Sequence, residues 1–158
     1  MGFRIYSATT VLLIILIMMC AGCTQHRFFE ENTRISDGKW NIYDTIFFNV
    51  EISDTSSRYS FYVNVRNDLS YPYSNLFLFL KTTFPDRRFA MDTLECTLAR
   101  YDGKWLGSGI GSVRYNRFLI QEQVGFRQAG TYTFGFIQAM RTKELEGIRD
   151  IGLRIEKF

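Results

Sequence analysis

The sequence has little of several residue types on which common enzyme classes depend. It contains one histidine, three cysteines and two prolines among 158 residues. With His26 as the single histidine, zinc sites built from several histidines are excluded. His26 also lies near the N-terminus, outside the expected folded region, so it cannot act as the base of a Ser-His or Cys-His catalytic pair. The scarcity of proline and the presence of 15 Phe and 9 Tyr favour β-strands.

Long apolar segments are also scarce, and the one at the N-terminus is short. Arg4 precedes an apolar run at 11–19, which is about half the roughly 20 residues that a membrane-spanning helix needs. A basic start, a short apolar run and the small residues Ala21 and Gly22 are typical of a secretory signal. We therefore expect residues 1–22 to be a lipoprotein signal peptide, with an uncleaved signal-anchor or an ordinary non-lipid signal as alternatives.

The junction "CAGC" indicates which cysteine is used. Ala21 and Gly22 precede Cys23, whereas Cys20 follows two bulky methionines that a signal peptidase would reject. The junction resembles a bacterial lipobox, although Cys20 stands where such boxes usually have leucine. We predict that Cys23 is lipidated and that Cys20 leaves with the signal peptide. The remaining thiol, Cys96, is expected to be buried.

The charge and composition do not indicate nucleic acid as a partner. The formal net charge is +3 at pH 7, and the basic residues are scattered, so nucleic acid is not an expected partner. No internal repeat or interior linker is present. We therefore expect a lipid-anchored tether at 23–37 and a single folded domain at 38–158.

Alternating apolar and polar residues dominate the chain after the tether. In "DTIFFNVEI", Ile46, Phe48, Val50 and Ile52 fall on one face of an extended strand. Similar runs are "RYSFYVNVRN", "NLFLFLKT", "DTLECTLA", "RYNRFLIQ", "GTYTFGFIQ" and "DIGLRIEKF". Turn residues separate these runs, so we predict an antiparallel β-sandwich, jelly-roll or Ig-like, of about 7–8 strands, with a closed barrel as the alternative.

Three runs carry more specific expectations. "NLFLFLKT" is apolar on both faces and predicts a central strand that is covered on both sides. "DTLECTLA" places Cys96 on the inward side with its leucines. Only "AMRTKELEGI" has helical character, which predicts one short helical turn near residues 141–147.

No catalytic, cofactor or metal site is predicted. "GKWLGSGIGSVRYN" lacks the spacing of a phosphate-binding loop and of a dinucleotide-binding motif, so we interpret it as a hairpin. The acids of the strands form no dense cluster for glycoside chemistry. The loop aspartates Asp44, Asp54 and Asp68 are interpreted as solvated turn residues rather than calcium ligands.

The aromatic segment "SYPYSNLFLFL" is the best candidate for a binding surface. Tyr71 and Tyr73 flank Pro72 at the start of a strand, and Trp105 is a further candidate. Exposed aromatics of this kind bind sugars or proteins. The alternative is that these side chains pack over one end of the sandwich.

Several motifs together resemble a known family. "YPYSNLFLFL", "DTLECTLA", "GKWLGSGIG", "GTYTFGFIQAMR" and "LEGIRDIGLRIEKF" are similar to the GldH gliding motility lipoproteins of Bacteroidetes, over about residues 28–158 and with the lipobox at Cys23. The resemblance implies a non-catalytic lipoprotein that is needed for gliding and linked to the type IX secretion machinery. It transfers no active-site residue; Cys23 is the one matched functional position.

The expected location follows from the resemblance and from the residues after the lipobox. Surface lipoproteins of this phylum usually carry acids directly after the lipidated cysteine, whereas Cys23 is followed by Thr-Gln-His-Arg. We therefore expect anchoring in the outer membrane, facing the periplasm, with protein partners in the motility machinery. The main rival is a carbohydrate-binding module, and a hydrolase would need two carboxyl groups that face each other in a cleft.

Overall fold

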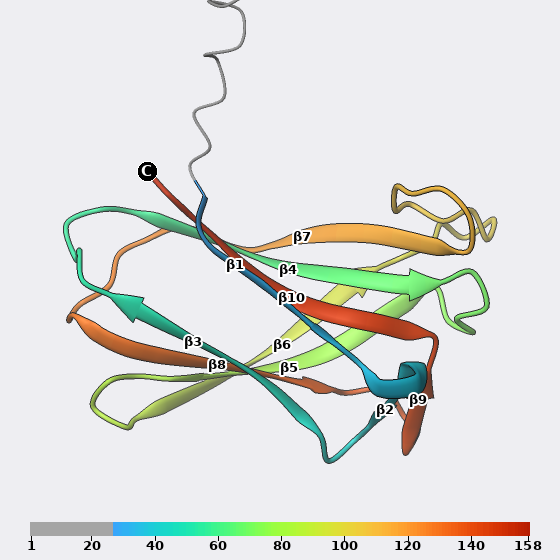
Figure 1. Cartoon of the computed structure of the whole chain (residues 1–158), viewed down its shortest axis with the longest axis horizontal. Coiled ribbons are helices and arrows are strands. Elements are labelled where there is room, and N and C mark those ends of the chain that lie inside the picture. The colour runs from blue at the N-terminus through green and yellow to red at the C-terminus, as the bar shows by residue number, and fades with distance from the viewer. Residues whose placement is uncertain (1–26) are drawn as a thin grey trace, which may run out of the picture.

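The computed structural model describes residues 27–158, in which two antiparallel four-stranded sheets are stacked face to face (Figure 1). The first sheet has the strand order β1-β10-β4-β7 and the second has the order β3-β8-β5-β6, while β2 and β9 form a separate pair. The predicted antiparallel sandwich is confirmed. The strands are Arg27–Arg34 (β1), Lys39–Asn41 (β2), Thr45–Ile52 (β3), Tyr59–Asp68 (β4), Asn75–Thr83 (β5), Phe89–Thr97 (β6), Val113–Val124 (β7), Gly130–Gln138 (β8), Glu144–Glu146 (β9) and Ile148–Lys157 (β10).

The core lies between the two sheets and follows the alternation seen in the sequence. Phe48, Val50 and Ile52 of β3 are buried, and Leu153 and Ile155 of β10 face them from the other sheet with no exposed surface. Because successive side chains of a strand point to opposite faces, one alternating run supplies the core and also sets what the outer face carries.

Strand β5 differs from its prediction. It lies in the interior of the second sheet, between β8 and β6, as predicted. Leu76, Leu78 and Leu80 are buried in the core, but Phe79 points outward and is 41% exposed. The prediction that both faces are covered is therefore wrong, because no further layer of the described chain packs over this face.

The short helical turn predicted near residues 141–147 is also wrong. This segment contains β9, which pairs antiparallel with β2 and places Leu145 opposite Trp40. Both side chains are 1% exposed, so burial against the core overrides the local preference of the sequence for helix. The helical segment in the described residues is a single 3₁₀ turn at Ser36–Gly38.

Residues 27–37 of the predicted tether belong to the folded domain instead. They form β1 and most of the 3₁₀ turn, and β1 pairs with β10 from Arg27 to Arg34. Most side chains of β1 are polar, so its sequence shows no clear apolar alternation. Residues 1–26, which include the predicted signal peptide, Cys20, Cys23 and His26, lie outside the described residues. No helix within 27–158 is both long enough and apolar enough to cross a membrane.

Cys96 lies in β6 with its side chain in the core, where it is 1% exposed. Burial, with a smaller effect from the charge of Glu95, raises the pKa of the thiol to about 12. The side chain therefore behaves as a small apolar group and not as a nucleophile.

We expect a polar maleimide to modify Cys96 about 100-fold more slowly in the native protein than in denaturant, because reaction requires local opening and ionisation. Mass spectrometry of the peptide that contains Cys96 would measure both rates. Equal rates in the two conditions would contradict the buried position.

Candidate functional site

The aromatic surface predicted at residues 71–73 does not form a flat platform. Tyr71 is 4% exposed, and its hydroxyl donates a hydrogen bond of 3.0 Å to the carbonyl of Asn75. Tyr73 is 41% exposed but meets Tyr71 edge-on, with ring centroids 5.6 Å apart and planes at 70°. Pro72 is exposed beside them. Only Pro72 and Tyr73 of this segment are open to solvent.

Trp105 is half-buried and packs against the core. Its backbone pairs with Ala99 in an isolated bridge, in the loop between β6 and β7. The glycines that follow permit close backbone contact, since a Cβ on Gly109 would lie 2.7 Å from the carbonyl oxygen of Val113. The hairpin interpretation of this loop agrees with these contacts.

The acids considered for catalysis are dispersed. Glu51 on β3 accepts a hydrogen bond from Thr131, and Glu95 on β6 accepts one from Asn75. Strands β3 and β6 are opposite edges of the second sheet, so these carboxylates do not face each other. Between Arg27 and Phe158, no group of three or more His, Cys, Asp or Glu side chains is placed to hold a metal ion.

The loop aspartate Asp54 has a structural role. It accepts hydrogen bonds from Ser56 and Ser57 and forms an ion pair of 2.7 Å with Lys157. The hydrogen bond from Lys157 is the largest of the effects that lower the pKa of the Asp54 carboxyl group far below its usual range. Asp54 thus joins the β3–β4 loop to the end of β10.

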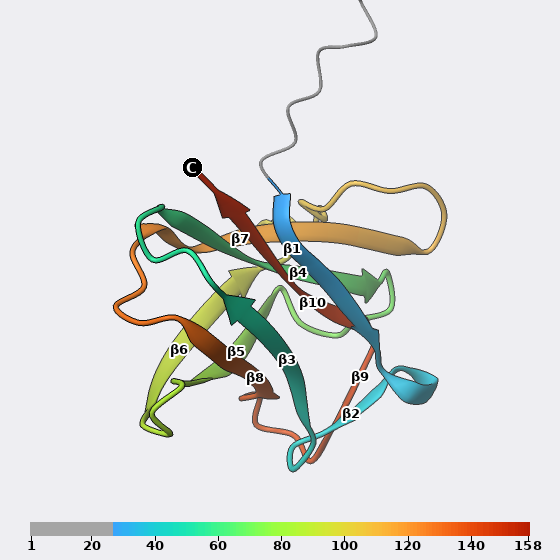
Figure 2. The same cartoon turned by 60° about the vertical axis from the view of Figure 1, so that its left-hand side comes forward.

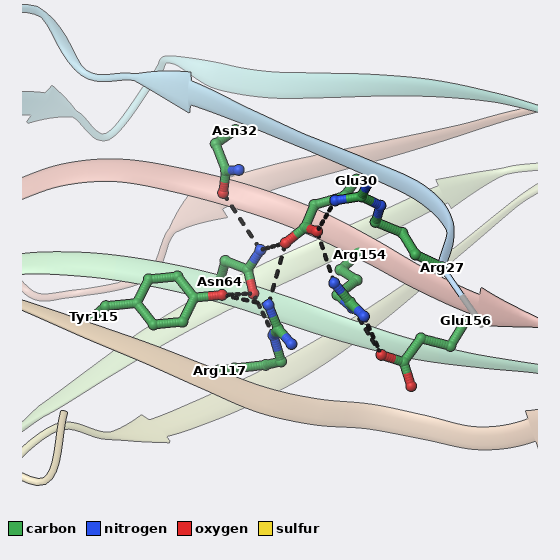
Figure 3. Close-up of polar contacts among 8 residues, drawn as sticks. All are labelled: Arg27, Glu30, Asn32, Asn64, Tyr115, Arg117, Arg154 and Glu156. Atoms are coloured by element: carbon green, nitrogen blue, oxygen red, sulfur yellow. Dashed lines mark hydrogen bonds and ion pairs between the residues drawn. The ribbon is translucent and has the colours of Figure 1, made fainter. Parts of the chain in front are cut away.

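A polar network covers the outer face of the first sheet (Figure 3). At its centre, Glu30 of β1 binds Arg154 of β10 at 2.7 Å and Arg117 of β7 at 3.2 Å. The Nδ2 of Asn64, on β4, donates to the same carboxylate at 3.1 Å. One carboxylate therefore links side chains from all four strands of the sheet.

The network continues on both sides of Glu30. The hydroxyl of Tyr115 and the Nε of Arg117 both donate to Asn64 Oδ1, at 2.9 and 3.0 Å. Arg154 also binds Glu156 at 2.6 Å. Each side chain of the network contacts at least one other member, so the network cross-links the strands of the first sheet.

A glycine allows the strands of this face to meet. Gly152 of β10 lies between Asn32 of β1 and Asn64 of β4 in the strand register. The two amides meet across it at 3.4 Å. A Cβ at Gly152 would overlap Asn32 Oδ1 and would lie 2.8 Å from the backbone carbonyl oxygen of Glu31, so a larger residue would displace Asn32 and force β1 away from β10.

The electrostatics of Glu30 follow from these contacts. Burial opposes its ionisation, but hydrogen bonds from Arg154 and Asn64 and the charges of Arg154 and Arg117 outweigh burial, so the pKa of Glu30 is lowered from 4.5. Its carboxylate is 17% exposed and remains ionised at neutral pH. An ionised carboxylate carries no proton to donate, so Glu30 cannot serve as a general acid at that pH.

The outer face of the second sheet combines paired polar side chains, such as Thr133 with Asn49, with several exposed apolar ones. Phe47 of β3, Phe79 of β5 and Phe89 and Met91 of β6 are 58%, 41%, 63% and 51% exposed. We call these four residues the apolar face. A Cβ on Gly135 would lie 3.1 Å from the ring of Phe47, which shows how closely that ring lies over β8.

The strand register places the apolar face on one side of the sheet, with polar side chains such as Lys81 and Thr93 between its members. On β5 and β6, Lys81 lies opposite Met91, and its ammonium group lies 4.9 Å from the ring centroid of Phe89. Ile137 of β8 lies opposite Phe79 and is partly buried. Neighbouring strands are about 4.8 Å apart, so these side chains form one surface across the sheet.

Sequence reasoning missed both faces for different reasons. Glu30 is separated from Arg117 by 87 positions and from Arg154 by 124, so no local motif shows the network. The apolar face did have a signal, because the two-sided apolar pattern of "NLFLFLKT" places Phe79 outward. That pattern indicated a second buried face, whereas the face is exposed.

We expect Glu30→Gln to lower the free energy of unfolding by about 2 kcal/mol at pH 7, because it removes one of the two carboxylates that pair with the buried Arg154 and charged hydrogen bonds contribute roughly 1.5–3 kcal/mol. Since folding lowers the pKa of Glu30, its stabilisation is fully present above pH 4.5 and is lost as pH falls through the folded-state pKa. Urea unfolding at pH 7 and at about pH 3 would measure both effects. Glu31→Gln, on the neighbouring exposed residue, is the control, and a deficit for Glu30→Gln that persists unchanged in acid would contradict the assignment.

Comparison with known proteins agrees with the sequence resemblance. The family model of the GldH lipoprotein matches residues 27–155. A gliding motility lipoprotein GldH homolog from Christiangramia forsetii is 35% identical over an alignment of 159 positions, which covers 96% of this chain and 97% of the relative. The gliding motility lipoprotein GldH of Flavobacterium johnsoniae is 29% identical over an alignment of 153 positions, which covers 92% and 94%. Because the family model matches most of the chain, this protein belongs to the GldH lipoprotein family.

Proposed function

We propose that this protein is an outer-membrane lipoprotein of the gliding motility machinery that acts through protein contacts and not through catalysis. The apolar face carries the proposal. Aromatic residues and methionine are enriched in the centres of protein interfaces, and an exposed apolar patch is a usual sign of an interaction site. The expected partner is a protein of the motility and type IX secretion machinery, whose assembly or stability the contact supports.

The contrast between the two outer faces supports this assignment. Polar groups on the first sheet are paired with one another through Glu30, Asn64 and Arg117. The apolar face instead exposes the rings of Phe47, Phe79 and Phe89 to water. A partner that covers these rings releases the water around them, and the rings themselves have no hydrogen bonds to water that would be lost. A partner protein gains more by binding the second sheet than by binding the first.

A carbohydrate-binding function has less support from the geometry. Sugar recognition of the kind considered from the sequence needs a row of exposed, coplanar rings. Tyr71 is buried and its ring plane is inclined by 70° to that of Tyr73, and Trp105 packs against the core. These rings do not form such a row.

Anchoring is proposed at Cys23, four residues before the start of β1. The absence of acids directly after Cys23 supports a periplasm-facing position in the outer membrane. This short connection keeps the β1 end of the sandwich close to the lipid surface, since four residues extend at most about 14 Å.

We expect Cys23→Ala to move the protein from the detergent phase to the aqueous phase in detergent partitioning, because the mature chain loses its lipid. Cys20→Ala is the matched control and should leave partitioning unchanged. Mass spectrometry of the mature N-terminus would identify the acylated residue. Partitioning of Cys23→Ala like the wild type would refute lipid attachment at this position.

We expect the double variant Phe47→Ser, Phe79→Ser to abolish colony spreading while the protein remains folded and anchored, because it removes two of the three aromatic rings of the apolar face and neither residue lines the core or the end cavity. Leu119→Ser is the control, since Leu119 is 51% exposed on the first sheet. Time-lapse imaging of colony edges measures spreading, and thermal unfolding checks the fold. Normal spreading by the double variant, or equal loss with the control, would reject the apolar face as the contact surface.

A further inference from the structure

A cavity of about 460 Å³ opens between the two sheets, and its lining includes residues of the β5–β6 turn and of the β7–β8 connection. These two connections lie at the same end of the sandwich, on the left in Figure 1. Aromatic and aliphatic side chains form its inner wall, and this volume lies within the range of small-molecule sites, about 300–1,000 Å³. The principal wall residues are Phe61, Phe84, Ile120, Phe126, Tyr132 and Phe134.

A distortion of β7 shapes the cavity. Opposite Tyr59–Tyr62 the register of β7 shifts twice, and Gln123 has a positive φ of 51°. The backbone N–H of Gln123 donates to the hydroxyl of Ser60, which fixes the bulge. Bulges of this kind redirect side chains next to functional sites, and here Ile120 and Val124 both line the cavity.

The wall of the cavity offers apolar contact and few hydrogen bonds. Among residues 27–158, no buried side-chain nitrogen or oxygen lacks a hydrogen-bond partner. Polar side chains gather at the rim, where Asp86 and Arg88 form an ion pair of 2.7 Å and Arg127 is exposed. This arrangement suits a ligand with a long apolar body and one polar end.

The start of β1 lies close to this cavity. The ring of Phe28 meets that of Tyr59 at 5.3 Å, and Tyr59 meets Phe126, a wall residue, at 5.1 Å. Two ring contacts therefore connect the first residues of β1 to the cavity wall. Cys23 precedes Arg27 by four residues, a span of at most about 14 Å.

We propose that this cavity binds one long acyl chain, and that the lipid on Cys23 supplies it. The second part rests on the lipidation proposed above, whereas the first depends only on the cavity. A ligand attached to the same chain by a short tether has a high effective concentration at the site. Binding of the acyl chain in the cavity removes both the aromatic wall and the acyl chain from water.

Binding can be tested on residues 23–158 with Cys23→Ser, which retain every described strand and the whole core. Fatty acids from octanoate to palmitate are titrated below their micelle concentrations by calorimetry. The affinity should rise about fourfold per added CH₂ until the cavity is full and then level off. Absence of saturable binding, or affinity independent of chain length, would overturn the proposal.

A cavity-filling variant locates the site. Ala90 lies on β6 and lines the cavity, whereas Thr93 lies on the outer face of the same strand. We expect Ala90→Phe to weaken palmitate binding at least tenfold and Thr93→Phe to leave it unchanged. If Ala90→Phe fails to fold, Thr82→Leu fills the same space from β5. If a folded Ala90→Phe or Thr82→Leu variant binds palmitate as tightly as the chain without the substitution, the assignment to this cavity is overturned.

The natural lipidated protein identifies the source of the acyl chain. If the lipid of Cys23 occupies the cavity, the lipidated protein should bind added palmitate at least tenfold more weakly than the Cys23→Ser chain. Equal binding would overturn Cys23 as the source and assign the site to a membrane lipid. A mature chain without lipid on Cys23 would refute the proposed anchoring, while the Cys23→Ser titration would still decide whether the cavity takes acyl chains.

Discussion

The first sheet depends on the two-sided pairing of β10. This strand bonds to β1 along one edge and to β4 along the other, as Figure 2 shows. Its inward residues Ile151, Leu153 and Ile155 are fully buried, and its outward residue Arg154 holds Glu30. One strand thus contributes to the core and to the polar cross-link, and the attachment of β1 depends on both.

The two sheets share one core but present different surfaces to the surroundings. On the first sheet, charged and amide side chains satisfy one another, and the surface is compatible with water. On the second sheet, outward rings such as Phe79 have no such compensation. The end cavity belongs to neither surface, because its wall combines residues of both sheets, such as Phe61 and Phe134. Three chemically distinct regions therefore result from a single alternating pattern.

The sequence predicted the parts of the fold that local alternation controls. The seven alternating runs correspond to β3–β8 and β10, and Cys96 is inward as predicted. Strands β1 and β9 were not predictable in this way, because β1 is mostly polar and β9 is too short for periodicity; their pairing partners determine them. The Glu30 network and the cavity depend on contacts between distant positions, such as Glu30 with Arg154, which no single segment encodes.

The position of Glu30 has a mechanical consequence. A force applied through the N-terminus reaches the β1–β10 ladder at its Arg27–Glu156 end and opens that ladder one pair at a time. Glu30 lies near this end and binds strands on the far side of β10 through Asn64 and Arg117. Three strands together therefore resist the separation of β1. The network opposes unfolding at the point where the force first acts on the domain.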